Sequence, residues 1–362
     1  MVTALVVDDS AFIRNAFAQM LRSDPEIDVV GVARDGEEAL ELVKKLDPDV
    51  VTMDIEMPRR DGLSALQAIM QSMPRPVIMV STLTLDGAEA TLKALEYGAV
   101  DFIPKFEPGK AAINLQAMQI DLCEKVKAVA RSRRFRRAPS AGAAPARPAP
   151  GVGPKATSDV ASATLAMPGG QPVRNCVAIG VSTGGPPAVQ KVLSALPEDF
   201  PAYILIAQHM PAAFTGPFAK RLDSVSKIQV KEAEDGERPR PGCAYVSPGG
   251  KHLILDGRAT MPFLTVTVEP AAALYKPSAN VLMESCSKML GNRAFGVIMT
   301  GMGSDGCDGL KMLKDKGGRV VAQNEASCVV YGMPKAVVEA GIADEIVELD
   351  SLAAAIVAGL YK

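Results

Sequence analysis

Three residue types are scarce in this chain of 362 residues: tryptophan is absent, histidine occurs twice and cysteine six times. The cysteines form no C-x-x-C pair, so a metal site built from thiolates and imidazoles is not expected. A reaction that needs an imidazole base can use only His209 or His252. We expect most of the cysteines to be small core residues: Cys123, Cys176, Cys243, Cys286, Cys307 and Cys328.

An excess of charge is also missing, because 39 basic residues are balanced by 41 acidic ones and the formal net charge is −2. No general attraction to nucleic acid or to an anionic membrane follows from this balance. No apolar run is long enough to span a bilayer, and the N-terminus lacks the basic region of a signal peptide. We therefore expect a cytoplasmic protein of about two domains.

Apolar strand patterns and amphipathic helix patterns alternate through residues 1–130. This alternation predicts an α/β domain with a doubly wound parallel sheet. The expected strands are Val2 to Val7, Val29 to Val32, Val50 to Met53, Val77 to Val80 and Val100 to Ile103.

Polar side chains follow these strands where the carboxyl edge of the sheet is expected. Asp8 and Asp9 end the first strand and Asp54 ends the third, so they could bind a divalent ion such as Mg²⁺, with Asp54 as acceptor of a phosphoryl group. Ser81 and Lys105 follow the fourth and fifth strands and could bind phosphate oxygens. Each residue alone could be a helix cap or a loop charge, but five at one sheet edge favour a site.

Residues 131–172 show neither the strand pattern nor the helix pattern. Five arginines within residues 131–137 lead into a segment rich in alanine, proline and glycine, which predicts a semi-extended linker. The arginines could bind an acidic partner, although such a run is more often the solvated end of a helix. A second domain is expected over residues 173–362.

The second domain contains a candidate nucleophile. An apolar strand from Cys176 runs into Gly180, Ser182 and Gly184, which have G-x-S-x-G spacing. This spacing fits a sharp strand-to-helix turn that exposes the serine hydroxyl and leaves backbone N–H groups free for an oxyanion. The alternative is that Ser182 is only the N-cap of the following helix.

A base and an acid follow from the same geometric rule. His209 follows the apolar run of residues 202–208, and Asp305 follows the strand of residues 294–300, so both are expected at the edge that carries Ser182. These three residues would form a catalytic triad, unless Asp305 merely caps the next helix. His252 begins a short strand that ends in a turn, and we expect it to be a surface residue of a hairpin and the weaker candidate base.

Taken together, these motifs resemble the CheB family of chemotaxis protein-glutamate methylesterases across both domains. The first domain resembles a response-regulator receiver in Asp8-Asp9, Asp54, Met57-Pro58, Asp61-Gly62, Ser81 and Lys105. The second resembles the methylesterase domain in Gly180-Val-Ser-Thr-Gly-Gly185, Gln208-His-Met210, Pro248-Gly-Gly-Lys-His-Leu253, Thr300-Gly-Met-Gly-Ser-Asp-Gly306 and Val330-Tyr-Gly-Met-Pro334.

The resemblance implies a flavodoxin-like receiver and a Rossmann-like catalytic domain. It implies hydrolysis of glutamate methyl esters on chemotaxis receptors, deamidation of receptor glutamines, and a chemotaxis histidine kinase as phosphodonor. It also implies the backbone amides of Thr183 and Met302 as oxyanion donors and the backbone carbonyl of Glu56 as a further Mg²⁺ ligand. No cofactor is implied for the esterase reaction, and neither nucleic-acid binding nor membrane insertion is expected.

Two positions differ from the family pattern. Receivers usually follow the lysine with proline, whereas the order here is Pro104-Lys105-Phe106, so the loop that carries Lys105 is expected to have a different shape. Cys328 stands where a small hydroxyl residue is more usual.

We expect the face beyond the fourth strand of the first domain to cover the Ser182 cleft until Asp54 is phosphorylated.

Three other classes of protein would require other sequence features. A transcription factor would need a basic helix-turn-helix after the linker, and a nucleotide-dependent oxidoreductase would need G-x-G-x-x-G; neither pattern is present. A non-catalytic binding module controlled by phosphorylation is the serious alternative, because every motif could persist in an inactive homologue.

Overall fold

The structure is a computed structural model that describes residues 1–105, 115–132 and 167–362. Phe106 and most of the expected linker lie outside the described residues. Within the described residues, no helix combines the length and apolarity needed to cross a membrane.

The first domain is a five-stranded parallel sheet with strand order β2-β1-β3-β4-β5. This is the flavodoxin-like order, which places a ligand crevice beside β1 and β3, where the strand order reverses. The strands are β1 (Val2–Val7), β2 (Ile27–Ala33), β3 (Val50–Asp54), β4 (Val77–Ser81) and β5 (Asp101–Pro104). The helices are α1 (Ala11–Arg22), α2 (Gly36–Leu46), α3 (Gly62–Ser72), α4 (Leu85–Glu96) and α5 (Leu115–Ala130).

Local sequence places the helix starts at the carboxyl edge of this sheet. The N-caps Ser10, Asp35, Asp61 and Thr84 each accept a hydrogen bond from the first turn of their helix. The first residue of α3 must be glycine, because a Cβ atom on Gly62 would lie 2.0 Å from the carbonyl oxygen that ends β3. The start of α3 therefore packs directly on the end of the strand that carries Asp54.

The second domain is built on a seven-stranded parallel sheet with strand order β14-β13-β12-β6-β7-β9-β8. Its strands are β6 (Cys176–Val181), β7 (Tyr203–Gln208), β8 (Gln229–Glu232), β9 (Cys243–Val246), β12 (Ala294–Ile298), β13 (Arg319–Gln323) and β14 (Glu345–Val347). The helices are α6 (Gly185–Ala195), α7 (Ala212–Val225), α8 (Ala279–Leu290), α9 (Cys307–Asp315), α10 (Met333–Glu339) and α11 (Leu349–Gly359), with short 3-10 turns η2 (Gly291–Arg293) and η3 (Glu325–Ser327).

The predicted α/β class with a parallel sheet in each domain is confirmed. The second domain adds an antiparallel hairpin, β10 (His252–Arg258) with β11 (Met261–Thr267), which lies outside the main sheet. Strand β6 is central, with β7 on one side and β12 on the other, and the strand order reverses there. The crevice rule therefore places the ligand site at the ends of β6, β7 and β12.

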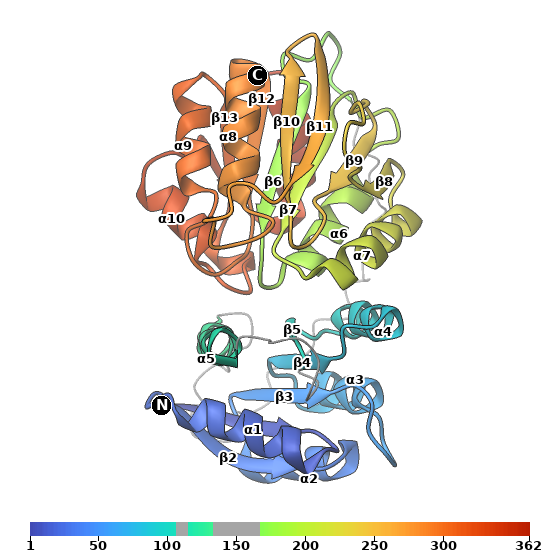
Figure 1. Cartoon of the computed structure of the whole chain (residues 1–362), viewed down its shortest axis with the longest axis vertical. Helices are drawn as coiled ribbons and strands as arrows, with labels where there is room; N and C mark the ends of the chain where they lie inside the picture. Colours follow the sequence, from blue (N-terminus) through green and yellow to red (C-terminus); the bar gives the residue numbers. More distant parts are fainter. Residues whose placement is uncertain (106–114, 133–166) are drawn as a thin grey trace, which may run out of the picture.

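The two domains pack against each other, with α4, β5 and α5 of the first domain facing the second (Figure 1). The rings of Phe102 and Phe214 lie 4.4 Å apart between centroids, and Arg221 on α7 forms an ion pair with Glu96 on α4. Val329 and Val330 of the second domain belong to the same buried cluster as α5. The interface therefore has an apolar centre with a charged pair beside it.

Candidate functional site

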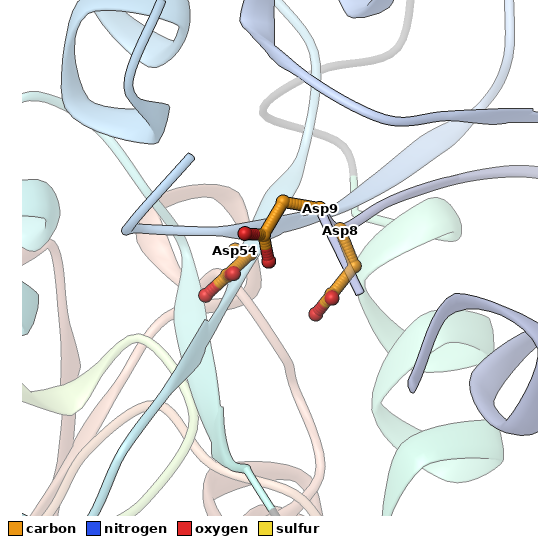
Figure 2. Close-up of side chains that lie close together, drawn as sticks. All are labelled: Asp8, Asp9 and Asp54. Atoms are coloured by element: carbon orange, nitrogen blue, oxygen red, sulfur yellow. The ribbon is translucent and has the colours of Figure 1, made fainter. Parts of the chain in front are cut away.

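The first candidate site is the group of carboxylates at the carboxyl edge of the first sheet. Figure 2 shows Asp8 and Asp9, directly after β1, beside Asp54, the last residue of β3. One oxygen from each lies within 4.8 Å of the others. Asp8 and Asp54 are buried while Asp9 is exposed, so the cluster is open to solvent on one side. Hard oxygen donors gathered in this way suit Mg²⁺.

Lys105 and Ser81 lie at the same edge, as predicted. The Lys105 ammonium is 2.7 Å from Asp54 Oδ2 and 3.1 Å from Asp8 Oδ2, so the unusual residue order after β5 does not keep it away from the carboxylates. Ser81 Oγ donates to the Gly87 carbonyl at 3.1 Å. A small cavity is lined by both residues together with Asp9, Asp54 and Glu56.

Burial dominates the electrostatics of this pocket. It raises the pKa of Asp54 to about 6 although Lys105 donates to the carboxylate, and the charge of Asp8 adds to the rise. Burial also raises the pKa of Asp8, against the charge of Lys105. Burial acts to lower the pKa of Lys105, but the bonds and charges of Asp54 and Asp8 together outweigh it, and the pKa is raised. The pocket therefore holds more negative charge than its one ammonium balances.

The second candidate site starts from the turn after β6. Ser182 follows β6, and α6 begins at Gly185 with Gly184 at the N-cap position, so the reading of Ser182 as that helix's N-cap is wrong. Gly184 has φ +74°, a left-handed conformation that favours glycine. A Cβ atom on Gly185 would lie 2.1 Å from the side-chain oxygen of Gln208. Two adjacent glycines thus let the turn close against β7.

The sheet register brings His209 beside Ser182. Val181 and Gln208 pair across β6 and β7, and the next residue on each strand is Ser182 or His209. The His209 backbone N–H donates to the Val181 carbonyl at 3.1 Å. Since paired strands lie about 4.8 Å apart, the serine and the imidazole are neighbours at the sheet edge. The described residues contain no hydrogen bond between the Ser182 hydroxyl and the imidazole.

Asp305 binds one nitrogen of the imidazole. Its Oδ2 lies 2.8 Å from His209 Nε2, whereas Nδ1 is buried and has no hydrogen-bond partner within the described part of the chain. Nδ1 is therefore the ring nitrogen available to accept a proton. The predicted proximity of these two residues is present in the structure.

Asp305 is held by the first turn of α8 rather than by the helix that follows it. It accepts from Ser278 Oγ at 2.8 Å, from the Ala279 N–H at 2.6 Å and from the Asn280 N–H at 3.0 Å. Gly306, not Asp305, occupies the N-cap position of α9, so the expected alternative was wrong. Burial acts to raise the pKa of Asp305, but the bond and charge of His209 and the two backbone donors lower it overall.

The two backbone donors expected for an oxyanion follow Ser182 and Gly301, and a hypothetical Cβ atom on Gly301 would lie 2.8 Å from the Ser182 Cβ. Across the described residues, neither the Thr183 N–H nor the Met302 N–H makes a hydrogen bond. Thr300 connects their loops: its carbonyl accepts from the Ser182 N–H at 3.0 Å, and its Oγ1 donates to the Thr183 carbonyl at 2.9 Å. Both amides are thus free in loops that are bonded to one another.

Sequence reasoning missed three residues around this site. Tyr275 stacks on His209 with ring centroids 4.2 Å apart and an interplanar angle of 12°. Ser278 donates a hydrogen bond to Asp305. Its position before an apolar helix pattern would indicate a helix N-cap but not this bond. His252 was expected at the surface of a hairpin; the hairpin is present, but the side chain is fully buried against the start of α8.

The first sheet carries a carboxylate pocket with an apposed lysine, and the second carries serine, histidine and aspartate at its switch point. Together these features define a two-domain protein of the response-regulator class. Residues 4–114 match the family model "Response regulator receiver domain", and residues 177–356 match "CheB methylesterase". The chain belongs to the CheB family of protein-glutamate methylesterases/protein-glutamine glutaminases.

Relatives support this membership over the whole chain. The chain is 62% identical to protein-glutamate methylesterase/protein-glutamine glutaminase 2 of Nitratidesulfovibrio vulgaris, with 100% of both chains covered. It is 45% identical to protein-glutamate methylesterase/protein-glutamine glutaminase of Pyrococcus horikoshii, over 97% of this chain and 91% of the relative. Its second domain is similar to the crystal structure of the Thermotoga maritima CheB methylesterase catalytic domain, with 38% identity, a TM-score of 0.50, and coverage of 51% of this chain and 98% of that one.

In buffer that contains no divalent cations, replacing Asp54 by asparagine should raise the stability of the folded protein. Because the pKa of Asp54 is raised from 3.8 to about 6, the folded state favours the protonated carboxyl, and that stability is lost as the pH rises through about 6. Asparagine cannot ionise, so Asp54→Asn should have the higher Tm at about pH 7.5, and its advantage should shrink toward about pH 4.

Thermal unfolding followed by circular dichroism across this pH range measures the difference. The matched control is Asp28→Asn, which removes an exposed carboxylate on β2 and should leave the Tm almost unchanged. A Tm for Asp54→Asn equal to or below that of the unaltered protein at neutral pH would contradict the description of the pocket.

Proposed function

We propose that this chain is a phosphorylation-activated serine hydrolase that removes methyl esters from glutamate side chains of chemotaxis receptors and deamidates receptor glutamines to glutamates. The observation that carries the proposal is the convergence of Ser182, His209 and Asp305 at the switch point of one sheet. A membrane receptor would present these side chains on its cytoplasmic part, where a chemotaxis histidine kinase would also supply the phosphoryl group.

In the first half-reaction, His209 Nδ1 takes the proton of Ser182 Oγ as that oxygen attacks the ester carbonyl carbon. Asp305 holds the ring and stabilises the imidazolium through Nε2. The tetrahedral intermediate collapses, the carbon–oxygen bond to the methoxy group breaks, and the imidazolium gives its proton to the departing methanol. An acyl-enzyme on Ser182 remains.

In the second half-reaction, His209 takes a proton from water, and the hydroxide attacks the acyl carbon. The bond to Ser182 Oγ breaks, the serine regains its proton, and a glutamate side chain leaves. With glutamine as substrate the first leaving group is ammonia instead of methanol. The amides of Thr183 and Met302 would bind the oxyanion of each intermediate, and such donors contribute roughly a hundred- to a thousandfold in rate.

The first domain would act as the phosphoryl acceptor. Asp8, Asp9, Asp54 and the backbone carbonyl of Glu56 would hold a Mg²⁺ ion, whose charge offsets the negative charge of the phosphoryl oxygens. Asp54 would accept the phosphoryl group, since it lines the cavity together with Ser81 and has one oxygen on Lys105. Lys105 and Ser81 would then bind phosphoryl oxygens.

The interface between the domains supports autoinhibition. The face formed by α4, β5 and α5 packs on the second domain, and Asp121 and Glu124 of α5 lie near enough to Tyr275 to raise the pKa of its phenol, after the larger effect of burial. Tyr275 in turn stacks on His209. Phosphorylation adds roughly two negative charges to the sheet edge. Shifting the equilibrium from almost fully covered to almost fully released would require about 5.5 kcal/mol.

Ser182→Ala should abolish methanol release from methylated receptor membranes, with a loss of at least about a thousandfold. His209→Ala and Asp305→Ala should be similarly impaired, and the double variant Ser182→Ala/His209→Ala no worse than either single one, because the residues act as a unit.

A serine-directed phosphonate should label Ser182 in the unaltered chain. Absence of any labelling would favour a non-catalytic module, and normal methanol release from Ser182→Ala would reject the triad.

Exchanging the charges of the interdomain ion pair should test autoinhibition. In Arg221→Glu the new carboxylate faces Glu96, so the covering face should detach more readily and the basal methanol release should rise about two- to fivefold, as expected for a partly exposed pair. Glu96→Arg should act similarly, whereas the double variant should return toward the basal rate. The rates are compared in unphosphorylated protein, and equal rates in all four proteins would speak against a covering role.

A further inference from the structure

His252 is the second of the two histidines in the chain, and the mechanism above does not use it. It begins β10, and its side chain is completely buried. Its Nδ1 accepts a hydrogen bond from the backbone N–H of Ser278 at 3.2 Å. The preceding loop is joined to the same segment, because the Gly250 N–H donates to the Lys276 carbonyl at 3.1 Å. His252 therefore supports the residue that starts α8.

Ser278 uses its hydroxyl in two directions. As the N-cap of α8, Oγ accepts from the Val281 N–H at 3.4 Å, and it donates to Asp305 Oδ1 at 2.8 Å. The next two backbone amides donate to the same carboxylate. The position of the first turn of α8 thus determines where three of the donors to Asp305 lie.

We propose that His252 is a positioning residue for the esterase: by accepting from the Ser278 N–H, it fixes the first turn of α8, and that turn holds Asp305 on His209. This inference rests on the proposed function for its kinetic consequence. The connected groups run from His252 through Ser278 and Asp305 to the imidazole that takes the serine proton.

The chemistry requires a neutral imidazole at this position. An acceptor at Nδ1 must carry a lone pair, whereas a protonated ring would present a second donor to the Ser278 N–H. Burial lowers the pKa of His252, and the nearby charge of Lys276 lowers it further, against opposing contributions from the Pro270 carbonyl and Asp305. The surroundings of His252 therefore favour the form that can accept.

The supported segment also contacts the base directly. Tyr275 lies three residues before Ser278 and stacks on the His209 ring. One short segment thus packs on the imidazole through its tyrosine and binds the carboxylate partner of that imidazole through its serine. A shift of Ser278 would disturb both contacts, so its effect should appear in the chemical step rather than in substrate binding.

The test compares two substitutions in the full-length protein. His252→Asn keeps a side-chain acceptor near the position of Nδ1, whereas His252→Leu keeps apolar volume and removes the acceptor. The matched control is Ser285→Ala, which deletes the bond from the Leu255 N–H to Ser285 Oγ at 3.0 Å. That bond also joins β10 to α8, but it does not involve Asp305.

Two readouts separate positioning from simple packing. In methanol release, His252→Leu should lower kcat about ten- to hundredfold with KM changed less than about twofold, because an unpaired buried donor costs enough to displace the turn. His252→Asn should retain most of kcat, and Ser285→Ala should leave it unchanged. In proton NMR, the downfield signal of the hydrogen shared by His209 and Asp305 should persist in His252→Asn and shift or vanish in His252→Leu.

Unchanged kcat and an unchanged downfield signal in folded His252→Leu would overturn the proposal. It would also be overturned if both His252 variants and Ser285→Ala lost activity in proportion to their loss of Tm. If the unaltered protein released no methanol, the proposed function would fail, while the NMR comparison would still decide whether His252 positions Asp305.

Discussion

The candidate active site of this protein depends on one carboxylate and the helix end that holds it. Asp305 is buried, which would by itself favour the neutral acid, yet it accepts four hydrogen bonds: one from the imidazole and three from the first turn of α8. Such donors, together with the positive end of the helix dipole, keep a buried carboxylate ionised. An ionised Asp305 binds the His209 ring at Nε2, which leaves Nδ1 as the nitrogen that can accept a proton.

The receiver pocket shows the opposite balance with the same residue type. Asp54 is buried to a similar degree, but it receives one backbone N–H and the Lys105 ammonium, and it faces the charges of Asp8 and Asp9. Its pKa is therefore raised where that of Asp305 is lowered. Asp305 is stabilised by the protein alone, whereas the receiver pocket keeps a surplus of negative charge that a divalent cation can neutralise.

The sequence predicted what depends on strand ends and missed what depends on contacts between distant elements. The residues Ser182, His209 and Asp305 each follow an apolar strand, and a parallel sheet brings such positions together. The capping of α8 by Asp305 joins positions 26 residues apart through tertiary packing, which no local pattern encodes. His252 was misplaced for the same reason: its hairpin has the alternation of a half-exposed strand, but the face that carries the imidazole packs under α8.

The position of the receiver links the two sites physically. The described part of α5 packs on Val329 and Val330, whose backbone N–H groups both donate to Thr300 Oγ1. The same hydroxyl donates to the Thr183 carbonyl, in the turn that follows Ser182. The face formed by α4, β5 and α5 therefore rests on a loop bonded to the turn that carries the proposed nucleophile. Movement of that face would alter the support of the Thr183 peptide, so the proposed autoinhibition and the proposed oxyanion donor share one interface.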